Sequence, residues 1–201
     1  MNEDESALIA LAQRGDLDAF NALVLRYQDS AYTRAYRLMN EPAAAADLTQ
    51  DAMLTAYRRL NTYRGGSFRS WLLRIVTNLC YDALRRDKRH PVVGIDDLSQ
   101  AEGGEEAWLP ASANTPEQDI QQRELLRAIE GCIHALPPDQ RVALILCDVD
   151  GLNYQTIADQ LNASLGTVKS RISRARASVR ACLQAFKELL PSAFRLKDDA
   201  D

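Results

Sequence analysis

The chain has 201 residues and a formal net charge of −4, with 46% hydrophobic and 6% aromatic residues. Its length fits one large domain or two small ones, and the low aromatic content favours an all-α fold over a sheet-rich one. No apolar run is long enough to cross a bilayer, and the acidic N-terminus is unlike a signal peptide. We therefore expect a cytoplasmic protein without direct membrane insertion.

Few residues point to catalysis. The sequence contains no Walker loop, no paired carboxylates in a plausible pocket and no nucleophile beside a base, which argues against an enzyme. The four cysteines, Cys80, Cys132, Cys147 and Cys182, lie far apart without a CxxC pair or a histidine at ligand spacing. We expect all four to be small apolar residues, with a redox or metal role as the alternative, and we expect no metal and no cofactor.

Apolar spacing predicts four helices in residues 1–90. The first three are expected at residues 5–14, 16–39 and 42–60, and Pro42 is well suited to the first turn of the third. The third helix places several acidic and amide side chains opposite its apolar residues. Such a surface suits a basic protein partner, although a solvated helix face is the alternative.

A glycine-containing loop at residues 61–66 precedes the fourth helix, which Ser67 is expected to cap. The paired glycines permit unusual backbone angles and close approach of a ligand. Trp71, Arg74 and Asn78 bring aromatic, guanidinium and amide groups together on the fourth helix. This mixture suits stacking and hydrogen bonding to unpaired bases, with Trp71 as a core residue as the alternative.

Residues 91–118 lose helical periodicity and carry acidic residues without a basic one. They are expected to form a flexible acidic linker, able to occupy a basic channel that otherwise takes nucleic acid. A helix is expected to begin near Pro116. Another is expected from Pro138, with Val149 among its core residues, and a polar tail follows at residues 191–201.

Residues 151–180 predict a helix-turn-helix. A short helix from Tyr154 to Leu161, a break at residues 162–164 and a second helix capped by Ser164 have suitable lengths. The second helix has an apolar stripe, and it carries five basic residues with no acidic residue in the same helix. That surface suits an anionic partner, although an ordinary helical hairpin with a solvated basic face is the alternative.

Together these features resemble the bacterial RNA polymerase sigma factors, specifically the small extracytoplasmic-function (ECF) group. The motifs that carry the resemblance are DLTQDAMLTAYRRL at 47–60, YRGGSFRSWLLRIVTNLCYDALRR at 63–86, LPPDQR at 136–141 and GLNYQTIADQLNASLGTVKSRISRAR at 151–176. Their order and spacing cover nearly the whole chain.

The resemblance implies that successive segments of the chain form domains with different functions. Residues 1–90 would form the region 2 domain, residues 91–118 the flexible acidic linker and residues 119–190 the region 4 domain with the helix-turn-helix, followed by the polar tail at 191–201. The first domain would bind core RNA polymerase and recognise and help to melt the −10 element. The second would recognise the −35 element.

The resemblance also implies the residues that make each contact. The segment that docks on the clamp helices of the largest polymerase subunit would comprise Asp47, Gln50, Asp51, Met53, Tyr57 and Arg58. The −10 element would contact Tyr63, Arg64, Gly65, Gly66, Ser67, Trp71, Arg74, Asn78, Arg85, Arg86, Lys88 and Arg89. The −35 element would contact Thr167, Lys169, Ser170, Arg171, Ser173, Arg174, Arg176 and Arg180.

Further partners follow from the same resemblance: the polymerase flap, promoter DNA and an anti-sigma factor, for which the apolar edges of both domains offer surfaces. Two other functions fit parts of the sequence. A stand-alone helix-turn-helix repressor or response-regulator output domain explains residues 119–190 but leaves residues 47–89 without a role. A helical scaffold that binds only proteins explains the acidic surfaces but not the basic second helix of the helix-turn-helix.

Overall fold

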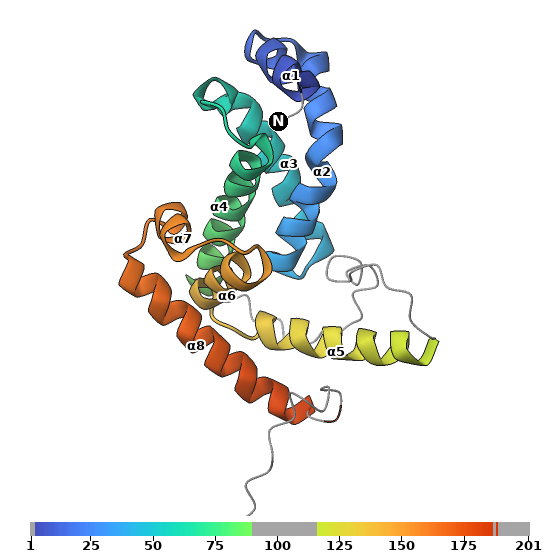
Figure 1. Ribbon diagram of the computed structural model, residues 1–201, viewed down its shortest axis with the longest axis vertical. Coiled ribbons are helices and arrows are strands. Elements are labelled where there is room, and N and C mark those ends of the chain that lie inside the picture. Colours follow the sequence, from blue (N-terminus) through green and yellow to red (C-terminus); the bar gives the residue numbers. More distant parts are fainter. Residues whose placement is uncertain (1–2, 90–115, 187, 189–201) are drawn as a thin grey trace, which may run out of the picture. The chain divides into compact units, whose positions relative to one another are not determined.

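The computed structural model describes residues 3–89, 116–186 and 188, and all the regular structure among them is helical (Figure 1). The expected all-α fold is therefore confirmed. The chain divides into two compact units, residues 1–99 and residues 100–201.

Two segments expected from the sequence lie outside the described residues. These are the tail at 191–201 and the linker at 91–118, apart from the last linker residues, which begin a helix at Pro116. Within the described residues, no helix is both long enough and apolar enough to cross a membrane. The same residues contain no cluster of histidine, cysteine and acidic side chains arranged to hold a metal ion.

The helices of the first unit begin and end where the local chemistry of the chain requires it. They are α1 (Glu3–Gln13), α2 (Leu17–Met39), α3 (Pro42–Arg59), the short 3-10 helix η1 (Leu60–Thr62) and α4 (Phe68–Arg89). Asp16 caps α2 by accepting a hydrogen bond from the backbone N–H of Ala19 at 3.0 Å. Asn40 ends α2 in the left-handed conformation, with φ 57°, and Pro42 occupies the first turn of α3 as expected.

Small residues allow α2, α3 and α4 to pack closely in the first unit. Ala45, Ala52 and Ala56 on α3 are fully buried, so its backbone approaches its neighbours without a bulky side chain between them. Larger apolar side chains of α2 and α4 complete the core. The one buried guanidinium among the described residues of this unit, that of Arg34, donates a hydrogen bond to Thr77 Oγ1 at 3.0 Å, so the charge has a polar partner.

The second unit contains the expected helix-turn-helix. Its elements are α5 (Pro116–His134), α6 (Pro138–Leu144), the π-helical segment η3 (Ile145–Val149), α7 (Tyr154–Leu161), α8 (Leu165–Leu183) and the short 3-10 helix η4 (Gln184–Phe186). The turn between α7 and α8 has the predicted chemistry. Asn162 is left-handed, with φ 48°, and Ser164 Oγ accepts from the backbone N–H of Thr167 at 3.1 Å.

The core of the second unit comes mainly from α6, η3, α7 and α8. Its fully buried side chains include Val142, Ile145, Ile157 and Ile172. The prediction that Val149 belongs to this core is wrong, since 37% of that residue is exposed. The π-helical hydrogen bond from Asp150 N to Ile145 O, at 3.0 Å, adds a residue to the turn and shifts the positions after it away from the α-helical period.

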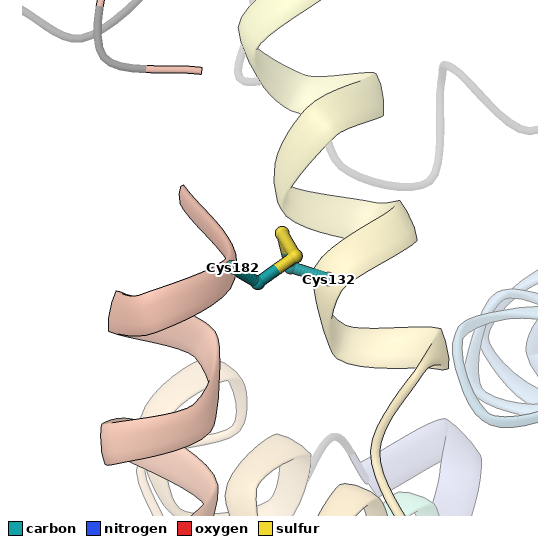
Figure 2. The surroundings of a disulfide bond; sticks show 2 residues. All are labelled: Cys132 and Cys182. Atoms are coloured by element: carbon teal, nitrogen blue, oxygen red, sulfur yellow. A yellow bond between two sulfur atoms is a disulfide. The ribbon is translucent and has the colours of Figure 1, made fainter. Parts of the chain in front are cut away.

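The expectation that all four cysteines are small apolar residues is wrong for two of them. Cys132 on α5 and Cys182 near the end of α8 form a disulfide bond, with their Cα atoms 5.7 Å apart (Figure 2). Their separation of 50 residues hid the pairing, because only the antiparallel packing of the two helices brings them together. Cys80 and Cys147 are free, and burial raises the pKa of Cys80 to about 12, so that it behaves as the expected apolar residue.

His134, the last residue of α5, makes the stability of the second unit depend on pH. Burial, and secondarily the charge of Arg141, lower the pKa of His134 to about 4. A histidine in an unfolded chain titrates near 6.5, so between these values the unfolded state binds more protons. The neutral imidazole of His134 therefore makes its full contribution to the stability of the second unit above about pH 6.5. That contribution is lost as the pH falls toward 4.

We expect acidification from pH 7 to pH 4.5 to destabilise the second unit by at most about 3 kcal/mol through His134. The variant His134→Gln cannot titrate and should show a shallower pH dependence, although its stability at pH 7 also changes. Hydrogen exchange of the α6–α8 amides at several pH values measures this difference. Parallel curves for the two proteins would show that the imidazole is not responsible.

Candidate functional site

The outer surface of α3 combines acidic and apolar side chains. Asp47, Gln50 and Asp51 are exposed, as the sequence predicted. Tyr57 is 39% exposed, with its ring centroid 5.0 Å from that of Phe20. These side chains form an acidic surface with an aromatic edge, which can bind a basic and partly apolar helical partner.

Three residues of the same helix complete the description of this surface. Arg58 is exposed, whereas Met53 is only half-buried and lies beside the core. Leu54, which the sequence analysis did not select, is 48% exposed between them. Its position three residues after Asp51 is the signal that could have identified it, since residues three apart in a helix share a face.

The loop between η1 and α4 has a shape fixed by two glycines and one tyrosine. Gly65 and Gly66 have φ values of 98° and 88°, a region that other residues rarely adopt. The hydroxyl of Tyr63 donates to the carbonyl oxygen of Gly66 at 2.6 Å and closes the loop on itself. Gln13 Nε2 of α1 donates to the carbonyl of Tyr63 at 3.3 Å, so α1 also supports the start of the loop.

Aromatic rings support this loop from below. Tyr63 is buried, and its ring centroid lies 5.6 Å from Phe68 and 5.5 Å from Trp71. Trp71 is half-buried, so it has both the core role and the accessible edge that the sequence left as alternatives. Gly65 and Gly66 are exposed, and the Tyr63 hydroxyl connects this cluster to the carbonyl of Gly66. Exposed backbone groups close to aromatic rings are a combination that suits an unpaired base.

The remaining candidates of the first unit lie in the loop before α4 and along α4 itself. Arg64, Ser67 and Arg74 are exposed, and Asn78 is half-buried. Further along, Arg85 and Arg86 are exposed, and the Arg85 guanidinium carbon lies 5.5 Å from the centroid of the Tyr81 ring, which holds it by a cation–π contact. The side chains of Lys88 and Arg89 lie outside the described part of the structure.

The exposed side of α8 presents basic and small polar side chains. Lys169, Ser173, Arg174 and Arg180 are exposed, while Thr167 and Ser170 are half-buried. The Arg174 side chain has a defined position, because its Nη2 donates to Ser170 Oγ at 3.0 Å and its Nε donates to Ser170 O at 3.3 Å. A helix that displays a pre-positioned guanidinium can place it against a base edge or a phosphate.

Two of the basic residues expected on this surface have acidic partners elsewhere in the unit. Arg176 makes a bidentate ion pair with Asp148 of η3, with N–O distances of 2.6 and 2.9 Å. The hydrogen bond from Arg176 lowers the pKa of Asp148. Arg171 pairs with Asp139 of α6 at 3.2 Å. Both pairs fix α8 against the rest of the unit.

The other three basic residues, Lys169, Arg174 and Arg180, form no ion pair with any residue that the structure describes. Their positive charge is therefore available to a ligand, whereas that of Arg171 and Arg176 is partly neutralised within the unit. The available charge follows α8 from its second turn to its end.

Comparison with known proteins identifies the two units. Residues 23–90 match the sigma-70 region 2 family, and residues 126–179 match the sigma-70 region 4 family. The chain is 35% identical over 176 residues to the ECF RNA polymerase sigma-E factor of Escherichia coli K12, covering 87% of this chain and 92% of that protein. The chain belongs to the ECF sigma factors.

A sigma factor of this type directs promoter-specific transcription initiation by RNA polymerase and is not an enzyme. Another relative is the ECF RNA polymerase sigma factor SigE of Mycolicibacterium smegmatis, 34% identical over 172 residues. The match covers 85% of this sigma factor but only 64% of the length of SigE.

Two solved structures resemble this one. The sigma factor RpoE of Bartonella quintana, in a co-crystal with the anti-sigma factor NepR, has a TM-score of 0.59 and 25% identity, covering 82% of this chain and 96% of RpoE. CnrH, in complex with the cytosolic domain of CnrY, has a TM-score of 0.57 and 25% identity, covering 91% of this chain and 99% of CnrH.

Proposed function

We propose that the two units of this sigma factor contact the same promoter at different elements while α3 holds the core polymerase. The observation that carries this proposal is the outer surface of α8, where Lys169, Arg174 and Arg180 are exposed without an ion-pair partner among the described residues. A separate set of loop and α4 residues in the first unit offers a surface of different chemistry. One surface suits duplex DNA, and the other suits unpaired bases.

The second unit reads the −35 element. The helix α8 acts as the recognition helix, with Thr167, Ser170 and Ser173 near the groove and Arg174 contacting a base edge or phosphate. Ser170 is a positioning residue, because its hydroxyl and its carbonyl both accept hydrogen bonds from Arg174. Lys169 and Arg180 bind phosphates, as do Arg171 and Arg176 if DNA exchanges with their internal carboxylate partners.

The first unit captures a base that leaves the duplex at the −10 element. The candidate pocket lies at Tyr63, Arg64, Gly65, Gly66 and Ser67. Trp71, Arg74 and Asn78 line its side, and Arg85, Arg86, Lys88 and Arg89 hold the phosphates upstream. Extruding a base costs a few kcal/mol, so a loop that binds the extruded base lowers the cost of opening the duplex. No nucleotide hydrolysis is needed.

Core polymerase binds α3 through its clamp helices, with the flap as a second contact for the region 4 unit. Asp47 and Asp51 supply negative charge, Gln50 supplies hydrogen bonds, Tyr57 and Met53 supply apolar contact, and Arg58 lies at the end of the surface.

A protein that works with RNA polymerase acts in the cytoplasm, where we expect this sigma factor to be located. The complex of RpoE with the anti-sigma factor NepR supports an anti-sigma protein as a further partner.

Run-off transcription with purified core polymerase and a promoter library tests this assignment. Start sites that appear only when the sigma factor is added, and that depend on both promoter elements, support it. Tight operator binding without polymerase, together with no new start sites, would instead favour a stand-alone repressor.

The substitution Arg174→Ala tests the −35 surface. We expect it to weaken use of a −35-dependent promoter by about 1 to 3 kcal/mol, because a base-edge contact is worth roughly that much. On a promoter whose −35 element is replaced, the same variant should act like the unchanged protein. Arg180→Ala is the comparison. Loss of a phosphate contact should weaken binding to all promoters by the same factor and should reduce the salt dependence of binding. An identical promoter profile for Arg174→Ala and the unchanged protein would remove Arg174 from the reading surface.

A further inference from the structure

The disulfide bond joins two helices of the second unit that also pack against each other. Cys132 lies in the last turns of α5 and is buried, whereas Cys182 lies one residue before the end of α8 and is half-buried (Figure 2). Among the α5 side chains that the structure describes, from Gln122 onward, the buried apolar ones are Ala128, Cys132 and Ile133. Among the described elements, α5 packs chiefly against α8. The bond therefore adds a covalent link to the packing of α5 against α8.

The core around the helix-turn-helix comes mainly from elements other than α5, which adds Ile133 and the half-buried His134 at its C-terminal end. Val142 and Ile145 from α6 and η3, Ile157 from α7 and Val168 and Ile172 from α8 are buried against one another. The ion pairs of Arg171 and Arg176 also join α8 to α6 and η3 rather than to α5. Opening the disulfide should thus release α5 and leave the DNA-reading part folded.

The bond is accessible to a reductant. Cys132 and Cys182 lie on the wall of an apolar pocket of about 400 Å³. The side chains of Arg127 and Phe186, which also line this pocket, are exposed. A small thiol, or the protruding active-site cysteine of a dithiol protein, can therefore reach a sulfur atom without unfolding the unit. A disulfide in a compartment that keeps thiols reduced is usually redox-sensing rather than a permanent structural link.

We propose that Cys132–Cys182 is a redox switch that attaches α5 to the recognition helix in its oxidised form and releases it when reduced. The reductant is a dithiol. One of its thiolates attacks a sulfur of the bond, forming a mixed disulfide and releasing the other cysteine as a thiolate. The second thiol then displaces the first cysteine. The dithiol becomes a disulfide, and Cys132 and Cys182 together gain two electrons and two protons.

Release of α5 changes how the second unit is connected to the first. In sequence, α5 lies between the helix-turn-helix and the segment that joins the units, so its 19 residues then add to the connection. A longer connection lowers the effective concentration of one DNA-binding unit near the other. This step rests on the proposed function, in which both units bind one promoter. Reduction of the disulfide should then lower transcription from −35-dependent promoters roughly two- to threefold.

Hydrogen exchange of the full-length protein, before and after treatment with dithiothreitol, tests the switch directly. We expect protection of the α5 amides to fall at least tenfold on reduction, while α7 and the first half of α8 keep theirs. Cys182→Ser should reproduce the reduced state without reductant, and Cys147→Ser, a matched half-buried cysteine, should retain the oxidised behaviour. The melting temperature of the second unit should also fall by roughly 10–20 °C on reduction.

Several results would overturn the proposal. They are four free thiols in the purified, air-oxidised protein, unchanged α5 protection on reduction, a bond that dithiothreitol reduces only in denaturant, or loss of protection throughout the helix-turn-helix. Run-off transcription with the Cys182→Ser variant separates this proposal from the proposed function. If the oxidised wild type initiates nowhere, the proposed function fails, whereas equal initiation by wild type and Cys182→Ser at a −35-dependent promoter counts against the switch alone.

Discussion

Replacing Asp51 by arginine is expected to weaken the association of this sigma factor with core polymerase by roughly 30- to 150-fold. The carboxylate is exposed on α3 one helical turn from Asp47, and Tyr57 of the same helix is also exposed. If that surface meets a basic partner, the reversal replaces an attraction by a repulsion, which costs about 2–3 kcal/mol. Titrating labelled protein against core polymerase measures the affinity of each variant at a fixed salt concentration.

The fold should tolerate this substitution. Exposed positions that make no specific contact usually change stability by about 0.5 kcal/mol or less, and arginine is a good helix former. Asp29→Arg is the matched control, since it reverses the charge of another exposed aspartate, on α2. We expect the control to bind polymerase as the unchanged protein does. Equal weakening by both variants would indicate a general charge effect and would count against the α3 surface.

Local chemistry explains why so much of the helical framework could be predicted. Helix starts depend on residues adjacent in the chain, and three that the sequence marked show this: Asp16, Pro42 and Ser164 act within about one turn. Asn162 likewise ends α7 through its own backbone conformation. The apolar period of α8 then predicts which of its sides is buried, because that period is also a local property.

The features that the sequence did not reveal depend on pairs far apart in the chain. Cys132 meets Cys182 across 50 residues, and Arg176 meets Asp148 across 28. Neither pairing has a spacing signature, so each requires the packing of α8 against its neighbours to be known. The prediction that Val149 is buried was wrong for a related reason, because a single π-helical turn changes the helical period on which that prediction depended.

The same distinction applies to the candidate sites. The exposed positions on α3 and α8 follow from helical period, whereas the closure of the loop by the Tyr63 hydroxyl depends on three-dimensional geometry. The sequence could suggest that Trp71 stacks on bases or packs in the core, but only the structure shows one residue half-buried between both environments. Local patterns thus located the surfaces, and tertiary contacts determine their shape.

Replacing both loop glycines by alanine is expected to reduce open-complex formation by roughly 10- to 100-fold, the equivalent of about 1.4–2.7 kcal/mol. Gly65 and Gly66 have φ values of 98° and 88°, and a Cβ at either position would meet no atom within 4 Å. The effect of Gly65→Ala with Gly66→Ala therefore arises from backbone strain, not from collision. Because the loop is exposed, it should relax to another conformation and lose the shape on which the proposed base contact depends.

Gly15→Ala is the matched control for this prediction. Gly15 has a φ of 96° with equally open surroundings, but it lies in the turn between α1 and α2. The Gly15→Ala substitution should introduce similar backbone strain per residue and leave promoter opening unchanged.

A second measurement separates the base contact from the cost of melting the duplex: binding of an unpaired nontemplate-strand oligonucleotide by the holoenzyme. If the loop captures an extruded base, the double variant loses as much affinity for the oligonucleotide as it loses in open complex. A loss no greater than that of Gly15→Ala would mean that the loop shape serves the fold and not the DNA.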